Sequence, residues 1–77
     1  MIRELDTVVL RRDLLESGLR IGDIGAVVYC YGDEATYEVE FVTADGRTVT
    51  VATLSEPDIR LMRKNEILHA RELVAAD

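Results

Sequence analysis

Hydrophobic and polar positions alternate most cleanly between residues 35 and 42. Tyr37, Val39 and Phe41 occupy every second position there, and Glu38 and Glu40 stand between them. Since successive side chains of a β-strand point to opposite faces of a sheet, this period of two predicts a strand with one buried face and one acidic face in water. A shift of one residue in the pairing would bury both glutamates, so we expect a well-specified register.

A second strand is predicted just before it, over residues 25–31. This run is apolar and β-branched, which favours a strand with both faces at least partly covered. Gly22 and Gly25 precede it, and two such glycines permit a positive φ or a close backbone approach at a corner. We therefore expect the most buried strand of the fold here, ending in a turn at residues 32–34.

One more strand is predicted near the N-terminus, over residues 5–11, where apolar and polar side chains alternate. Residues 12–21 follow with no regular period and predict a folded-back loop. A helical turn ending at Gly18 is the alternative for part of that loop.

The second half of the chain predicts a hairpin and a closing strand. Asp45-Gly46 is a tight-turn signal, so we expect residues 48–54 to pair with the alternating strand. Residues 55–58 offer a serine cap and the chain's only proline in the first turn, which predicts a one-turn helix. Residues 59–62 are short and apolar enough to form the last strand.

The C-terminal stretch, residues 63–77, is ambiguous. Asn65 is suited to cap a short helix, which we favour, whereas residues 67–71 are equally suited to an edge strand. Together the elements predict a mainly β fold, a small five-stranded Src-homology-3-like barrel with a one-turn helix before the last strand and a short C-terminal helix or edge strand. We expect a single domain over residues 1–77, with the barrel at about 4–62 and an extension at 63–77.

Length and composition agree with a small soluble domain. The chain has 77 residues, of which 48% are apolar, and a chain of this size buries only roughly 60% of its unfolded surface. No apolar run approaches the roughly 20 residues that cross a bilayer, so we expect no membrane association. The N-terminal segment lacks a continuous apolar region, and the single Cys30 is too few for a small secreted domain. These features predict a cytoplasmic protein.

Charge is distributed unevenly along the chain. The total is −6, and the same balance of −6 is found within residues 32–59, where one arginine stands against seven acids. A surface built from that segment repels phosphate backbones and favours a basic partner. The acids of the segment are Asp33, Glu34, Glu38, Glu40, Asp45, Glu56 and Asp58.

The sequence offers no convincing catalytic or metal-binding pattern. One cysteine and one histidine, Cys30 and His69, are too few for a metal site. The pair Glu38 and Glu40 suggests acid–base chemistry, but the alternation explains both as water-facing strand residues. No helix is predicted after Gly25, which argues against a phosphate-binding loop. We therefore expect no enzymatic activity and no cofactor.

Several short motifs keep the order and spacing of a known family. On them the chain resembles the family called domain of unknown function 4926 over about residues 4–62, with one departure at Leu15, where that family more often has proline. The resemblance implies a small prokaryotic protein of Src-homology-3-like fold with no assigned activity and no catalytic residue, some members being encoded beside a toxin-like partner. The motifs are Leu5-Asp6-Thr7-Val8-Val9-Leu10, Asp13-Leu14, Gly18-Leu19, Gly22-Asp23-Ile24-Gly25, Val27-Val28, Tyr37-Glu38-Val39-Glu40-Phe41-Val42, Asp45-Gly46 and Thr53-Leu54.

A non-catalytic protein-binding module is the function that these observations favour. We expect an acidic face to dock a basic surface on a protein encoded nearby, which the resemblance implies to be toxin-like, and we expect this chain to be its antitoxin-like or inhibitory partner. An accessory barrel subunit of an enzyme complex is the first alternative, by a more distant similarity to the end of the nitrile hydratase β subunit. A nucleic-acid-associated barrel is the second, although the acidic strand argues against it, and exposed edge strands leave self-association open. The predicted partner-binding residues are Tyr31, Asp33, Glu34, Glu38 and Glu40.

Overall fold

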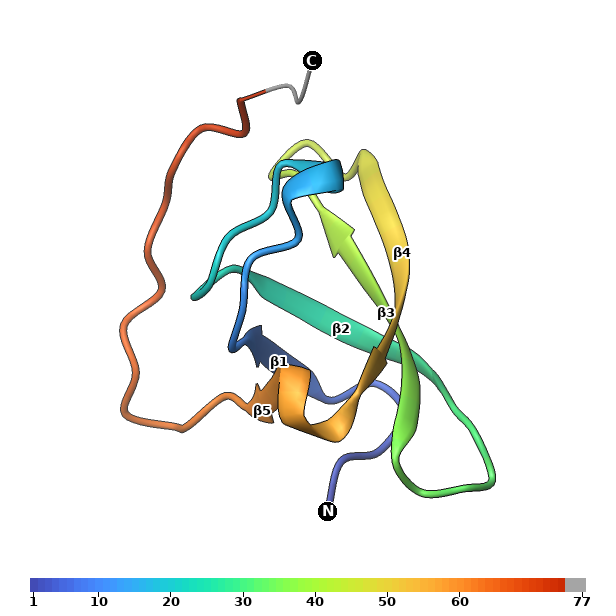
Figure 1. Cartoon of the computed structure of the whole chain (residues 1–77). Coiled ribbons are helices and arrows are strands. Elements are labelled where there is room, and N and C mark those ends of the chain that lie inside the picture. The colour runs from blue at the N-terminus through green and yellow to red at the C-terminus, as the bar shows by residue number, and fades with distance from the viewer. Residues whose placement is uncertain (75–77) are drawn as a thin grey trace.

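Residues 1–74 fold into one five-stranded antiparallel sheet with two one-turn 3₁₀ helices (Figure 1). The computed structural model describes residues 1–74. The strand order is β4-β3-β2-β1-β5, which confirms the expected mainly β fold with a one-turn helix before the last strand. The elements are β1 (Thr7–Leu10), η1 (Leu15–Ser17), β2 (Ile24–Cys30), β3 (Thr36–Val42), β4 (Thr48–Ser55), η2 (Glu56–Asp58) and β5 (Ile59–Leu61).

The sheet curls so that its two ends share one core. Strands β1 and β5 stand at one end of the strand order and β3 and β4 at the other, yet their side chains pack into a single cluster. Figure 1 shows β4 bending over β3 toward η2, in the layout of a small open barrel. The buried members of the cluster are Val8, Leu10, Leu19, Val27, Tyr37, Val39, Phe41, Leu54 and Ile59.

Two glycines shape the corner where β2 begins, in the two ways that the sequence predicts. Gly22 has a φ of +94°, which strains any other residue. Gly25 packs against β3 so closely that a Cβ atom there would lie 2.7 Å from both Phe41 Cε1 and Val39 Cγ1. The corner therefore depends on one glycine for its backbone conformation and on the other for space.

Strand β2 is not the most buried strand, so that expectation is wrong. Its outward side chains Val28 and Tyr29 are 43% and 51% exposed. The reason is the pairing with β3, in which Tyr29 lies opposite Glu38. Because cross-strand neighbours share a face of the sheet, the outward face of β2 continues the acidic face of β3 into water.

The alternating strand, the hairpin and the one-turn helix before the last strand form as predicted, whereas η1 is the helical turn that the sequence predicts only as the alternative to a loop. Every second residue of β3 is buried. Gly46 takes a φ of +84° in the hairpin turn, and Gly18 takes one of +71° where η1 ends. Ser55 and Asp58 exchange hydrogen bonds as a capping box around η2, which is the local signal that starts a helical turn.

Residues 62–74, which we call the C-terminal segment, form neither the helix nor the edge strand expected there. They run along the outside of the barrel as an irregular chain (Figure 1). Ile67 and Leu68 are 91% and 72% exposed, so the segment has no apolar face against the core. Short helices depend on such packing for their stability, which explains why none forms. The remaining residues of the expected extension, 75–77, lie outside the described part.

Two ion pairs attach the C-terminal segment to the barrel. Arg60 of β5 donates to both carboxylate oxygens of Glu66, at 2.8 and 2.7 Å. Arg71 donates to the carboxylate of Asp23 in the turn before β2, at 2.9 Å from Nε to Oδ1. The segment is therefore positioned by charged side chains and not by buried apolar ones.

Candidate partner-binding surface

The water-facing side of β2, β3 and β4 carries the acidic strand at its centre. The register places Tyr29 of β2 and Thr53 of β4 on either side of Glu38, and Val51 of β4 beside Glu40. Four of the side chains on this side are apolar or aromatic and about half exposed. We call this surface the outer face, and it consists of Val28, Tyr29, Tyr31, Glu38, Glu40, Val42, Val51 and Thr53.

Hydroxyl donors on both neighbouring segments hold the carboxylate of Glu38. The Tyr31 hydroxyl donates to Oε2, and Thr53 Oγ1 lies 2.7 Å from Oε2 and 2.9 Å from Oε1. The bond from Tyr31, and then that from Thr53, lowers the pKa of Glu38 below its ordinary value. The same bond raises the pKa of the Tyr31 hydroxyl. Glu38 is therefore a fixed, ionised acceptor at neutral pH.

Neither Glu38 nor Glu40 has a cationic neighbour within residues 1–74. Glu40 accepts a hydrogen bond of 2.8 Å from Thr48 Oγ1, which is neutral. Two ionised groups without a counter-charge project a negative potential from the outer face. The ion pairs found in this part of the chain all lie elsewhere and join Arg12 to Asp58, Arg47 to Asp45, Arg60 to Glu66 and Arg71 to Asp23.

Two tyrosine rings border the carboxylate of Glu38. Tyr29 and Tyr31 meet edge to face, with ring centroids 5.0 Å apart and an interplanar angle of 81°, a favourable arrangement for aromatic pairs. A guanidinium group stacks on aromatic rings and donates to carboxylates in a fixed geometry. The outer face therefore has the chemical groups that recognise an arginine side chain.

Asp33 and Glu34, predicted as part of the same site, lie instead in the turn between β2 and β3. The Asp33 carboxylate accepts from the Ala35 and Thr36 backbone N–H groups at 3.0 and 2.9 Å, and these bonds lower its pKa. The Glu34 carbonyl accepts from the Tyr37 hydroxyl at 3.1 Å. The structure thus brings Tyr31, Glu38 and Glu40 together and gives Asp33 a role in the turn.

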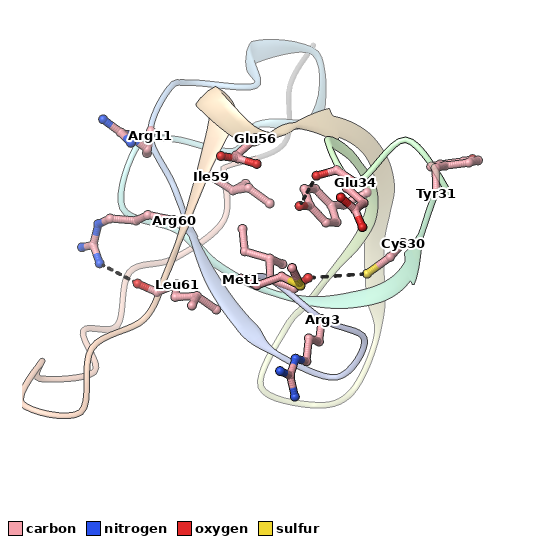
Figure 2. Close-up of a pocket in the computed structure, with 12 residues that line it drawn as sticks. Met1, Arg3, Arg11, Cys30, Tyr31, Glu34, Glu56, Ile59, Arg60 and Leu61 are labelled. Carbon is pink, nitrogen blue, oxygen red and sulfur yellow. Dashed lines mark hydrogen bonds between the residues drawn. The ribbon is translucent and has the colours of Figure 1, made fainter.

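A hollow of about 680 Å³ at one end of the barrel has no counterpart in the sequence analysis (Figure 2). Its lining comes from the N-terminus, the end of β2, the following turn, η2 and β5, so no single motif marks it. Figure 2 shows Met1 and Ile59 near its centre, while Arg11 and Arg60 point away. Burial, followed by nearby carboxylates, raises the pKa of the Cys30 thiol at its rim, which disfavours nucleophilic chemistry there.

Residues 1–74 contain neither a cluster of metal ligands nor a membrane-spanning helix. Among them, no three His, Cys, Asp or Glu side chains gather closely enough to hold a metal ion. Cys30 and His69 belong to different segments, the end of β2 and the C-terminal segment. The helices of this part of the chain include none with the length and apolar character to cross a membrane.

A known protein family matches most of the chain. The family model described as Domain of unknown function (DUF4926) matches residues 4–61, which confirms the resemblance drawn from the sequence motifs. Neither a curated protein nor a solved structure matches the chain. The family description names no activity.

Proposed function

The chain belongs to the DUF4926 family of domains of unknown function, and from that premise we propose that it is a non-catalytic protein-binding module of the bacterial cytoplasm. The outer face is its binding surface, and its partner presents arginine or lysine side chains. One observation carries the proposal. The Glu38 carboxylate is fixed by Tyr31 and Thr53 but has no cationic partner within residues 1–74.

In the proposed recognition, charged and apolar groups have different roles. Glu38 and Glu40 attract a basic surface and orient it, because complementary potentials accelerate encounter and select partners more than they add affinity. The exposed side chains of Tyr29 and Val51, 51% and 49% exposed, supply the apolar area that such a partner covers. A partner side chain that reaches the carboxylates also lies beside the tyrosine rings.

We take the partner to be a protein encoded close to this chain, of the toxin-like kind that the family resemblance implies, and the chain to be its antitoxin-like inhibitor. An activity assay of the partner, alone and in the complex, distinguishes this role from the alternative of an accessory subunit. Suppressed activity supports an inhibitor, whereas restored activity supports a subunit.

Binding to the purified product of the adjacent gene tests the surface assignment. The double variant Glu38→Gln/Glu40→Gln removes two charges from the outer face and should weaken binding at least tenfold, with the largest effect at low salt. Glu16→Gln/Glu72→Gln is the matched control, since it removes the same charge at exposed positions that belong to none of the strands of that face. Equal affinities for the two double variants would show that the outer face is not the binding surface.

A further inference from the structure

The outer edge of β4 has no strand beside it among residues 1–74. Strand β4 is the first strand in the sheet order, and its ladder partner is β3. Figure 1 shows β4, drawn in yellow to orange, at the margin of the molecule. The opposite edge, β5, is only three residues long, whereas β4 has eight. Main-chain groups along such an edge are a template for another strand.

The hydrogen bonding between β3 and β4 shows which backbone N–H and C=O groups of β4 point away from the sheet. The Glu56 N–H donates to the Ala35 carbonyl at 2.9 Å, and antiparallel ladders alternate between hydrogen-bonded and non-hydrogen-bonded pairs. Counted from that pair along the β3–β4 register, Val51 and Thr53 occupy non-hydrogen-bonded positions. Their N–H and C=O groups therefore point away from β3, and within residues 1–74 they have no backbone partner.

The regular part of this edge, residues 50–55, has little of the usual protection against pairing, because the register shift of the β3–β4 ladder lies before it, between the pairs Phe41–Thr50 and Val42–Thr48. Natural edge strands are blocked by lysine, proline, bulges or short length. Residues 48–55, Thr-Val-Thr-Val-Ala-Thr-Leu-Ser, contain no charged residue and no proline and are rich in β-branched residues. This composition favours strand pairing and does not oppose it.

We propose that two copies of this chain associate through β4, antiparallel and about a two-fold axis near Val51 and Ala52, into one continuous ten-stranded sheet. An uncharged strand is self-complementary in that arrangement, because each residue near the axis lies opposite the same residue of the second copy or a close neighbour of it. Val51 and Thr53 then meet the same residues of the second copy on the outer side of the sheet. This inference does not depend on the proposed partner.

Electrostatic repulsion between the copies is weak at this edge. Among the residues of the strands, the acids opposite Val51 and Thr53 are Glu40 and Glu38 on β3, so those of the two copies are separated by three strand spacings, about 14 Å. That distance exceeds the Debye length of about 8 Å at physiological ionic strength. The net charge of −6 on each copy still opposes association at low salt. Association through β4 should therefore strengthen as salt is added.

An open hollow beside the edge leaves room for the second copy. It lies between the loop that contains η1 and residues 52–54 of β4, with a volume of about 450 Å³, and its lining includes charged residues of both signs, Arg12, Asp13 and Glu16. Leu15 on that loop is 74% exposed. A second copy paired with β4 would reduce the exposure of this apolar side chain, which adds a hydrophobic contribution to the main-chain pairing.

Sedimentation velocity of the whole chain over a range of concentrations tests the proposal. The expected result is a shift from 8.6 kDa toward twice that mass, stronger at high salt. Val51→Lys should weaken the association at least tenfold by placing a charge at the edge. Val42→Lys is its matched control, because Val42 has a similar exposure, 53% against 49%, but belongs to the interior strand β3. The added lysine changes the net charge by the same +1 in both variants, so general repulsion cannot explain a difference between them.

Hydrogen exchange of the unaltered chain provides a second measurement that does not depend on a variant. The Val51 and Thr53 amides should become protected as concentration rises, while amides of β5 stay unchanged. A single-chain mass at all concentrations, or equal effects of the two lysine variants, would overturn the proposal. Glu38→Gln/Glu40→Gln should leave the association intact, and partner binding weakens with salt where self-association strengthens, so the two hypotheses fail independently.

Discussion

Arg71 donates to both carboxylate oxygens of Asp23, a residue 48 positions earlier in the chain. The same guanidinium donates to the Gly18 carbonyl at 3.1 Å, and Asp23 also accepts from the Arg20 N–H at 2.8 Å. Burial by itself raises the pKa of Asp23, but the bonds from Arg71 and Arg20 outweigh it and lower the pKa. One carboxylate thus stabilises the turn before β2 and holds the far end of the C-terminal segment.

Substitution Arg71→Gln should release the C-terminal segment beyond Glu66. No backbone–backbone hydrogen bond joins residues 67–74 to the barrel. Without the Arg71 side chain, their amide resonances should therefore move toward random-coil values, while those of β1 to β5 stay in place. Nuclear magnetic resonance spectra of the two proteins measure this directly. Lys64→Gln is the control, since Lys64 belongs to the same segment and makes no ion pair within residues 1–74. A segment that keeps its shifts in Arg71→Gln contradicts the anchoring role.

Acid should detach the other anchor of the C-terminal segment in a defined range of pH. The hydrogen bond from Arg60, then that from the Arg63 N–H, lowers the pKa of Glu66 to about 2 from the ordinary 4.5. A carboxyl whose pKa is lower in the folded chain stabilises that state above the unfolded pKa, and the contribution is lost as the pH falls through the folded value. The Glu66 carboxyl resonance should therefore titrate near pH 2, together with the amide shifts of residues 63–66. Titration at pH 4.5 would show that the pair with Arg60 does not form in solution.

Substitution Gly25→Ala should destabilise the barrel, by about 1 to 3 kcal/mol in the free energy of unfolding. The added Cβ atom would lie 2.7 Å from Phe41 and Val39 atoms and 3.0 Å from the Glu40 carbonyl oxygen, so β3 has to move. Gly32→Ala is the matched control, because that position has no atom within 4 Å of the new Cβ and no positive φ. Urea denaturation of both variants decides the point, and equal stabilities would mean that the corner accommodates a methyl group.

The strands could be predicted because their signals are local. The alternation at Tyr37, Val39 and Phe41, the turn at Gly46 and the cap at Ser55 each act within a few residues, and each forms as expected. The exposure of β2 depends on a partner strand instead. Its apolar run suggests two covered faces, and only the pairing with β3 turns one of them to water.

The prediction of a helix or an edge strand in the C-terminal segment is wrong for a related reason. Its conformation depends on Arg60 and Arg71 meeting carboxylates through the fold, and on the absence of an apolar surface for Ile67 to cover. Sequence periodicity records neither relationship. The same distinction applies to the predicted binding residues. The alternation along β3 predicts correctly that Glu38 and Glu40 share one face, whereas only charge connects Asp33 with them, and Asp33 lies in the turn.

The Tyr31 hydroxyl provides the sharpest test of the outer face, since it positions a charge without carrying one. Tyr31→Phe removes the bond that contributes most to lowering the pKa of Glu38, so this pKa should rise toward its ordinary value while Thr53 still donates. Tyr29→Phe is the control, because its ring packs against Tyr31 without a hydrogen bond to Glu38. A carboxyl titration by nuclear magnetic resonance should show the shift in the first variant alone. If partner binding depends on an ionised and oriented Glu38, Tyr31→Phe should weaken partner binding by a smaller factor than Glu38→Gln does. Unchanged partner binding in both variants would show that Glu38 is not part of the binding site.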